Sequence, residues 1–520
     1  RTALDVAAEL IPWRGESIAA DCHARPIGYP YALMMDFVRR LQPARLIRAI
    51  GFAVLAITFS SIPPAHAVES PRSKIDLSGT WKFFPAFKEI EVSHQFLQEP
   101  LGVDRTYDED ERDKNYGWIE PDFDAAKWWD IQVPGSWNTQ FEDLWSYEGL
   151  GWYRKEIDIP SEWEGKRVVF RSDGANYRTV LYVNGEKVGA HKGGYTAFSF
   201  PIQDHLKFGE TNSLAITVDN ESNFDRVPME RHDWWVHGGL YRPVYLEVTN
   251  PLFIEDVDVA TQVETDPVSV DLRILLGSLG KEDGPVELIA SLLKEGKAVA
   301  RIDKSATLKG DSIPLTLQVE NPERWTPDNP FLYTLEIQLK KEGEEEASDI
   351  WSQRIGLRSI RVEGTQLLLN GEPFLVKGVN RYENYAETGM TSTPESLQRD
   401  IDLIKGLGAN TVRCHYTYAR ETYEKLDEAG LFAVCEIPLY QWGRPGHSEK
   451  NLEAAKSQLT EMIDTLGNHP SVFMWSVSNE TRTRPREEGE EHERLSEMVV
   501  RGNNELIALA HRLDPTRPVI

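Results

Sequence analysis

The stretch that decides the fold is Ser-Val-Phe-Met-Trp-Ser-Val-Ser-Asn-Glu, residues 471–480. Residues 472–475 are all apolar or aromatic, which is typical of a strand buried on both faces of a parallel sheet. The strand is followed by the polar pair Asn479 and Glu480. Barrels of alternating strands and helices place their catalytic groups at this end of the strands. A glutamate that only caps the following helix is the simpler alternative, and the rest of the chain decides between the two.

Strands and helices alternate on both sides of this stretch. Thr393 and Pro394 predict a helix start, as an N-cap followed by proline at the first helical position. The alternation indicates a parallel sheet and the first half of a TIM (β/α)8 barrel at 363–520. Because half a barrel leaves unpaired edges, we expect the sequence to be truncated. The predicted strands are 374–378, 411–414, 431–435 and 471–476, with a fifth beginning at 518, and the predicted helices are 394–407, 418–429, 450–466 and 490–513.

Two all-β segments precede the barrel. Residues 68–250 hold short strands separated by Gly, Pro and Asn turns, which predicts a β-sandwich. Within it, Asn184-Gly185 is a strong hairpin signal. Residues 251–362 alternate apolar and polar side chains and predict an immunoglobulin-like sandwich of about seven strands.

The N-terminal region resembles a secretory signal. Basic residues at 39–48 precede an apolar run at 49–59, and Ala65-His66-Ala67 fits a small-x-small cleavage site. The apolar run is too short to span a bilayer, which argues against a membrane anchor. We therefore expect residues 1–67 to be an upstream segment and signal peptide. The mature protein would begin near Val68 and be secreted or periplasmic.

Composition limits the partners of the chain. Its formal net charge is −26, which argues against nucleic acid and anionic membranes, since both are bound by clustered Lys and Arg. Fifteen tryptophans are many, and carbohydrate-binding proteins use such rings as platforms against sugars. Cys414 and Cys435 lie in apolar strands without histidines at ligand spacing, so we expect buried free thiols and no zinc site. The sequence gives no reason to expect a cofactor or a metal, and homo-oligomer formation stays open.

Several ordered motifs identify a family. The chain from about residue 75 to 520 resembles the family-two glycoside hydrolases, which include β-galactosidases, β-glucuronidases and β-mannosidases. The resemblance implies a jelly-roll sandwich of the sugar-binding type at 68–250, followed by the immunoglobulin-like sandwich and the catalytic barrel. The motifs that carry it are residues 133–138, 151–155, 183–189, 193–196 and 233–242 in the first sandwich, and 378–383 and 468–480 in the barrel.

The resemblance also implies roles for single residues. Glu480 falls on the acid/base glutamate, and Asn479 falls on the asparagine that contacts the sugar 2-hydroxyl. Asp233 falls on an aspartate that reaches from the sandwich to the terminal sugar. The other residues implied are Arg413, His415 and Asn380 in substrate binding, and Glu436 in a more structural role.

Two departures from the family sequence affect these roles. Tyr382 stands where the first barrel strand usually has histidine. The segment from Arg413 to Thr417 is one residue shorter than usual and lacks its proline. A slip of one residue in a strand reverses the side that a side chain faces, so the placement of His415 is open.

The implied reaction is hydrolysis by a retaining exo-β-glycosidase. Such an enzyme needs a proton donor and a nucleophilic carboxylate. We expect burial and the second carboxylate to raise the pKa of Glu480. In the family the nucleophile comes from the seventh strand, which would lie beyond Ile520, so this chain alone should be inactive.

The sequence leaves the substrate open. Met474-Trp475-Ser476 and Tyr147-Glu148-Gly149 favour a β-glucuronidase over a β-galactosidase. A non-catalytic carbohydrate-binding protein with a decayed barrel is the alternative from another class. The intact pair Asn479 and Glu480 argues against decay.

Overall fold

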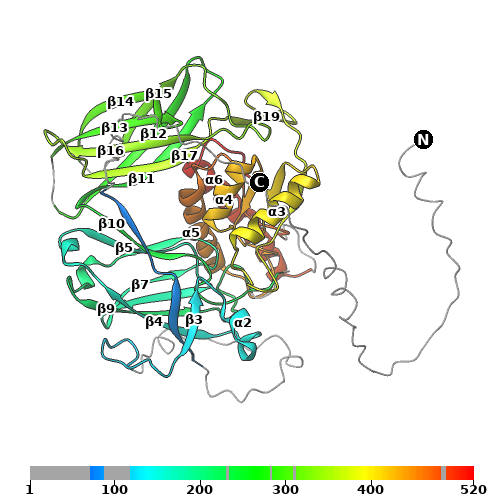
Figure 1. The fold of residues 1–520 in the computed structure, drawn as a ribbon. Coiled ribbons are helices and arrows are strands. Elements are labelled where there is room, and N and C mark those ends of the chain that lie inside the picture. Colours follow the sequence, from blue (N-terminus) through cyan, green and yellow to red (C-terminus); the bar gives the residue numbers. More distant parts are fainter. Residues whose placement is uncertain (1–70, 87–116, 230–233, 281–283, 309–311, 482–487) are drawn as a thin grey trace, which may run out of the picture. The chain divides into compact units, whose positions relative to one another are not determined.

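The structure is a computed structural model that describes residues 71–86, 117–229, 234–280, 284–308, 312–481 and 488–520. The chain divides into two units, Arg1–Ala67 and Val68–Ile520, and every described residue belongs to the second. The predicted signal peptide therefore lies outside the described residues. Figure 1 colours the first sandwich blue to teal, the second green, and the barrel segment yellow to red.

The first domain is a β-sandwich of two antiparallel sheets. One sheet has six strands in the order β3-β2-β4-β9-β6-β7, and the other has four in the order β1-β10-β5-β8. Trp81, Trp137 and Trp152 are fully buried among the aliphatic side chains of these sheets. The strands are β1 (Ser73–Asp76), β2 (Gly79–Pro85), β3 (Trp129–Val133), β4 (Leu150–Asp158), β5 (Arg167–Ser172), β6 (Arg178–Val183), β7 (Glu186–Lys192), β8 (Phe198–Pro201), β9 (Thr211–Asp219) and β10 (Val244–Thr249).

The hairpin predicted at Asn184-Gly185 is present between β6 and β7. Both residues have positive φ, 52° and 87°. A two-residue turn of this kind needs φ > 0 at both central positions, which asparagine and glycine tolerate best. Asn370 and Gly371 form the corresponding turn, with φ of 53° and 86°, between β19 (Gln366–Leu369) and β20 (Glu372–Pro373).

The second domain is an immunoglobulin-like sandwich of three and four antiparallel strands. Buried and exposed residues alternate along several of its strands, and the buried ones form the core. In β15, every second residue from Ile313 to Val319 is buried. The sheets have the orders β11-β12-β15 and β14-β13-β16-β17. The strands are β11 (Leu252–Gln262), β12 (Val268–Ser278), β13 (Pro285–Lys294), β14 (Lys297–Thr307), β15 (Ile313–Val319), β16 (Tyr333–Lys341) and β17 (Asp349–Ile355).

The barrel segment alternates parallel strands and helices, as the sequence predicts. Thr393 caps α3 by accepting from the Ser396 amide, and Pro394 is the first helical residue. Leu397, Ile401 and Ile404 bury one face of this helix, whereas Leu407, at the same spacing, is 75% exposed. The elements are β21 (Gly378–Asn380), α3 (Pro394–Gly406), β22 (Thr411–Arg413), α4 (Arg420–Ala429), β23 (Phe432–Glu436), α5 (Glu449–Leu466), β24 (Val472–Ser476) and α6 (Glu490–Leu513). A short antiparallel sheet with β18 (Ile360–Glu363), β19 and β20 precedes them.

The first barrel strand begins later than predicted. The sequence predicts it at 374–378, but β21 spans Gly378–Asn380. The physical reason is Asn410, whose side chain accepts from the Lys377 amide and donates to the Leu375 carbonyl. These hydrogen bonds hold the backbone before Gly378 in an irregular path, and Leu375 is exposed to solvent.

The last three residues lie beside β24. Val519 forms a parallel bridge with Trp475, and the Ile520 amide donates to the Trp475 carbonyl over 2.9 Å. The start of a fifth parallel strand at residue 518 is therefore confirmed.

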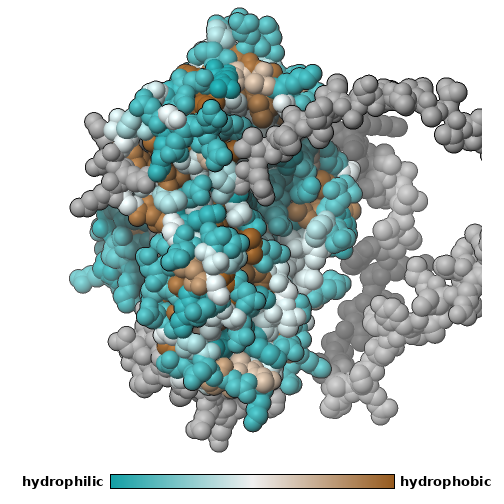
Figure 2. All heavy atoms as spheres, turned by 60° about the vertical axis from the view of Figure 1, so that its left-hand side comes forward, coloured by the Kyte–Doolittle hydropathy of each residue, from teal (hydrophilic) through white to brown (hydrophobic). Residues whose placement is uncertain are grey.

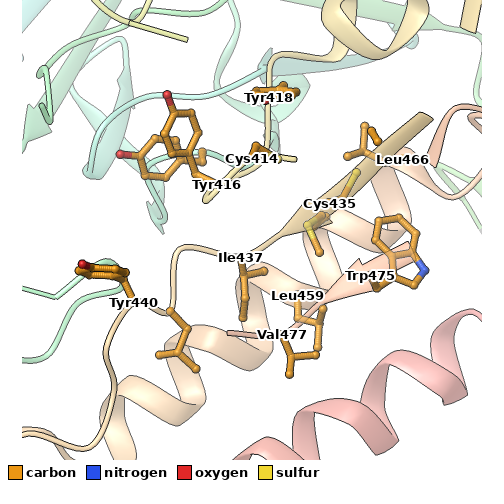
Figure 3. Packing of buried hydrophobic residues seen from close by; sticks show 14 of the residues in the cluster. Cys414, Tyr416, Tyr418, Cys435, Ile437, Tyr440, Leu459, Leu466, Trp475 and Val477 are labelled. Atoms are coloured by element: carbon orange, nitrogen blue, oxygen red, sulfur yellow. The ribbon is translucent and has the colours of Figure 1, made fainter. Parts of the chain in front are cut away.

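The barrel core contains both cysteines of the described residues. Cys414 and Cys435 are fully buried free thiols, as predicted. They pack with the side chains of Tyr416, Tyr418 and Trp475 shown in Figure 3. Burial raises the pKa of the Cys414 thiol to about 12, which makes it a packing group and not a nucleophile.

One face of the described residues is mainly polar. On the face shown in Figure 2, hydrophilic residues dominate and hydrophobic residues form scattered patches. None of the helices in the described ranges combines the length and apolar character that crossing a membrane requires.

Candidate active site at the carboxyl end of the barrel strands

The polar residues predicted for the site follow the carboxyl ends of the four parallel strands. Asn380 and Arg413 end β21 and β22, and Glu436 ends β23. Asn479 and Glu480 follow β24 by a few residues. Because parallel strands share one carboxyl edge, the sheet brings these side chains to the same end of the barrel.

Arg413 connects three of the strands through its guanidinium group. Its Nη2 donates to the Glu436 carboxylate over 2.6 Å and to the Asn479 Oδ1 over 2.8 Å. Ser476 Oγ also donates to Glu436 over 2.5 Å. Glu436 is fully buried, and burial raises its pKa, while the hydrogen bonds from Ser476 and Arg413 oppose the increase. A carboxylate held by two donors on neighbouring strands orients Arg413, which fits the structural role implied for Glu436.

The same contact orients the Asn479 side chain. Asn479 is 8% exposed, and its backbone pairs with Tyr440 in a short parallel extension of β23 and β24. Its Oδ1 accepts from Arg413, which leaves the amide NH2 as the group available to a ligand. This is the polarity required to donate a hydrogen bond to a sugar hydroxyl.

Glu480 differs from the sequence prediction in its exposure. We expected a buried carboxylate, but the side chain is exposed in this chain, and its backbone adopts the left-handed region with a φ of 50°. Its Oε2 accepts a hydrogen bond from Gln441 Nε2 over 2.7 Å. Gln441 also has a left-handed φ, of 49°. Two non-glycine residues in this sparsely populated region face each other at the candidate site, where such strain is most often found.

His415 lies on the side of the barrel that faces the first sandwich. Its Nδ1 is 2.7 Å from the Tyr382 hydroxyl, and the two rings stack with centroids 5.3 Å apart. The Trp234 ring stacks against the His415 ring with centroids 6.1 Å apart and contacts the Tyr440 ring edge-on at 5.7 Å. Tyr382, the residue that departs from the family sequence, is thus the direct partner of His415.

The predicted residue Asp233 lies outside the described residues. Its neighbour Trp234 is described and is 8% exposed, with its indole N–H donating to the Tyr195 hydroxyl over 2.8 Å. Asn380, the last residue of β21, is exposed. Within the described part of the chain, its side chain takes no part in the hydrogen bonds of Arg413 with Glu436 and Asn479.

The sequence reasoning missed Gln441, Tyr440 and Trp234 as parts of this site. Trp234 belongs to a motif quoted for the family, so its position could have been foreseen. Gln441 follows a strand by five residues in a loop without a recognisable motif. Its contact with Glu480 depends on two loops meeting, which no local spacing indicates.

Glu383 is buried, lies outside the network of Arg413, Glu436 and Asn479, and has a structural role. Its carboxylate accepts from Arg242 over 3.1 Å, from Thr422 over 2.6 Å and from the Ala419 amide over 3.1 Å. Arg242 follows the Leu240-Tyr241 segment of the first sandwich, so this ion pair joins the sandwich to the barrel. Among the described residues, no group of three His, Cys, Asp or Glu side chains is arranged to hold a metal ion.

Comparison with known families matches this architecture domain by domain. Residues 76–251 match the glycosyl hydrolases family 2 sugar binding domain, and residues 252–358 match glycosyl hydrolases family 2. Residues 360–520 match the glycosyl hydrolases family 2 TIM barrel domain. The chain belongs to glycosyl hydrolase family 2.

Some of the relatives are named beta-galactosidase and others beta-glucuronidase. A beta-galactosidase of Thermoanaerobacter pseudethanolicus is 33% identical over 76% of this chain and 52% of its own length. A beta-glucuronidase of Canis lupus familiaris is 30% identical over 87% of this chain and 69% of its own. The crystal structure of Bacteroides uniformis beta-glucuronidase superposes with a TM-score of 0.73 and 28% identity, over 86% of this chain and 52% of that one. The chain thus spans about half the length of several of the relatives it matches.

Proposed function

We propose that the full-length protein is a retaining exo-β-glycosidase that removes terminal β-linked sugars, with Glu480 as its general acid/base. The observation that carries the proposal is the arrangement at the carboxyl edge, where Arg413 orients Asn479 directly before an available Glu480 carboxylate. Glu480 would protonate the leaving oxygen, and the nucleophilic carboxylate would attack the anomeric carbon from about 5–5.5 Å away. The resemblance places that nucleophile on the seventh barrel strand.

The buried residues around Glu480 support the binding half of this reaction. The Asn479 NH2 would donate to the sugar 2-hydroxyl. Arg413 would hold that amide in position through its bond to Oδ1. His415, Trp234 and Tyr382 form an aromatic wall that would exclude water from one side of the sugar.

A glucuronide is the substrate we propose first, with a β-galactoside as the alternative. Beta-galactosidases and beta-glucuronidases occur in both comparisons, and the order is supported only by beta-glucuronidase being the more frequent name among these relatives and solved structures. Of the sequence features that favoured the same order, Ser476 contacts the site through Glu436, whereas Met474 and Tyr147 have other partners. Met474 packs with Phe432 and Phe473, and the Tyr147 hydroxyl donates to backbone carbonyls of the sandwich.

The direct test is a substrate comparison in the full-length protein. We expect kcat/KM for p-nitrophenyl β-glucuronide to exceed that for the galactoside by about a hundredfold or more, because a site built for a charged group rejects an analogue that lacks it. Preference for the galactoside would contradict the glucuronidase assignment alone. Lack of turnover of both, together with binding of the free sugars, would favour the non-catalytic carbohydrate-binding protein.

We also propose export of the protein, on the basis of the signal-like residues 39–67. Mass spectrometry of the protein made in its own cells should find Val68 at the mature N-terminus. A cytoplasmic protein that keeps residues 35–67 would contradict this proposal.

A further inference from the structure

Two tryptophans of the first sandwich are left in solvent and stack on each other. Trp145 follows the short helix η1 (Glu142–Leu144) and is 60% exposed, and Trp235 is 46% exposed. Their ring centroids are 5.7 Å apart, and their planes differ by 24°. Among the tryptophans that the structure describes, these two are the most exposed. Neither ring belongs to a hydrophobic core cluster of the described residues, so packing does not explain their size.

A single buried side chain holds both loops in place. Asn138 is 7% exposed and donates through Nδ2 to the Leu144 and Tyr147 carbonyls, over 2.8 and 3.1 Å. Its Oδ1 accepts from the Gly238 amide over 2.8 Å. The loop that carries Trp145 and the segment that carries Trp235 are therefore tied to one residue. An exposed aromatic pair that is preorganised in this way loses little conformational freedom when it binds a ligand.

The pair adjoins the candidate active site. Trp235 directly follows Trp234, whose buried ring contacts His415 and lies 5.7 Å from Tyr440. Tyr440 in turn precedes Gln441, which donates to the Glu480 carboxylate. Trp235 therefore lies one residue beyond the aromatic wall, and Trp234 of that wall is connected to Glu480 through Tyr440 and Gln441.

The charge of the Trp145 loop favours a neutral ligand over an anion. The Trp145 loop, residues 141–149, contains Glu142, Asp143 and Glu148, all exposed, and no Lys or Arg. These carboxylates repel anions but accept hydrogen bonds from hydroxyl groups. A β-linked pyranose offers a flat face of C–H groups for the rings and a rim of hydroxyls for the carboxylates. Exposed apolar surface rimmed by polar groups is typical of a binding site.

We propose that Trp145 and Trp235 form a platform for a neutral sugar ring on the leaving-group side of a β-linked saccharide. The position on the leaving-group side rests on the proposed function, because it is Glu480 that would protonate the leaving oxygen. The natural substrate would then be a saccharide chain with a neutral residue next to the terminal sugar. The platform would bind the part of the substrate that remains after cleavage.

Direct binding tests the platform separately from catalysis. The full-length protein with Glu480→Gln would be titrated with cellotetraose, a neutral β-linked probe, by isothermal calorimetry. We expect Trp145→Ala and Trp235→Ala each to weaken binding by roughly tenfold, as for truncation of an aromatic anchor. Trp145→Phe should lose less, because a ring remains. Trp163→Ala, which removes a partly buried tryptophan of the same sandwich outside the pair, is the matched control and should not change the affinity.

Three results would overturn the platform: no binding of cellotetraose at millimolar concentration, affinities unchanged by both alanine substitutions, or equally tight binding of an oligouronate. In the catalytically active protein, both substitutions should lower kcat/KM more for a glycoside with a cellobiose leaving group than for the methyl glycoside. Equal losses on the two glycosides would also contradict the platform. If neither glycoside is hydrolysed, the proposed function fails, while the calorimetric result still decides the platform.

Discussion

Glu383 and Glu480, two glutamates of the barrel segment, are held in opposite ways. Glu383 is fully buried, and both of its oxygens accept hydrogen bonds from groups that include the buried Arg242. Glu480 is exposed, and from the described residues it accepts a side-chain hydrogen bond of the neutral Gln441. A carboxylate whose lone pairs are all used cannot exchange protons with a ligand at low cost, whereas a carboxylate at a rim can. The comparison separates the acid that stabilises the fold from the acid that is available for chemistry.

The largest expected effect is on catalytic turnover when Glu480 is substituted. Glu480→Gln in the full-length protein should lower kcat by roughly 10²–10⁴-fold for glycosides with poor leaving groups, because their departure requires a proton. Glycosides with good leaving groups should lose much less. The measurement is kcat over a series of aryl glycosides of increasing leaving-group pKa. An equal loss across the series would remove Glu480 from the acid role.

Substitution in the buried ion pair of Arg242 and Glu383 should affect stability. Glu383→Gln leaves the charge of Arg242 buried without its counterion, which typically costs about 3–5 kcal/mol. Urea unfolding of the full-length protein would measure the change. Glu480→Gln is the control, since substitution of an exposed residue usually changes stability by less than about 0.5 kcal/mol. If the two substitutions cost the same, the distinction drawn between the two acids is wrong.

Local patterns predicted the fold well and the site in part. The hairpin at Asn184, the helix start at Thr393 and the buried strand before Asn479 each depend on neighbouring residues, so spacing and turn chemistry were sufficient. The late start of β21 was missed because it depends on one side chain, Asn410, that lies more than thirty residues away. The left-handed backbone of Glu480 was missed because glutamate rarely adopts this conformation and the strand pattern before it does not indicate one.

Contacts between distant segments explain the remaining misses. The bond between Arg242 and Glu383 joins residues that are 141 positions apart, and that between Gln441 and Glu480 joins residues 39 apart. Neither pair has a periodicity that would reveal it. The wall of Trp234, Tyr382 and His415 likewise requires the sandwich and the barrel to be packed before it exists.

Asp233 offers a sharper test of how the first sandwich contributes to the candidate active site. The residue precedes Trp234, whose ring packs against His415, and the family resemblance assigns its carboxylate to sugar hydroxyls. Loss of charge-assisted hydrogen bonds worth about 1.5–3 kcal/mol should lower kcat/KM roughly 10- to 200-fold in Asp233→Ala. Asp225→Ala is the matched control, because Asp225 forms an exposed ion pair with Lys450 on α5, and such pairs contribute little. Unchanged kinetics in Asp233→Ala would mean that the sandwich does not complete the site.

The smallest expected effect concerns an acid that is exposed like Glu480 but crowded by other acids. Asp464 on α5 has its pKa raised to about 6 by partial burial and by Asp256 and Asp258 of the second sandwich. A carboxyl whose pKa is higher in the folded state than in the unfolded state binds its proton more tightly when folded. Its ionisation therefore costs stability above pH 6, and this cost disappears as the pH falls toward 4.

Asp464→Asn should thus stabilise the protein at pH 8 by less than about 1 kcal/mol, a modest value because solvent screens the exposed carboxylate. The gain should shrink through pH 6 and vanish near pH 4, where the aspartic acid is also neutral. Urea unfolding at the three pH values measures it. Asp402→Asn, which alters an exposed acid on helix α3 away from Asp256 and Asp258, serves as the control. A gain of equal size at pH 4 and pH 8 would show that neither partial burial nor repulsion from the second sandwich acts on the ionisation of Asp464.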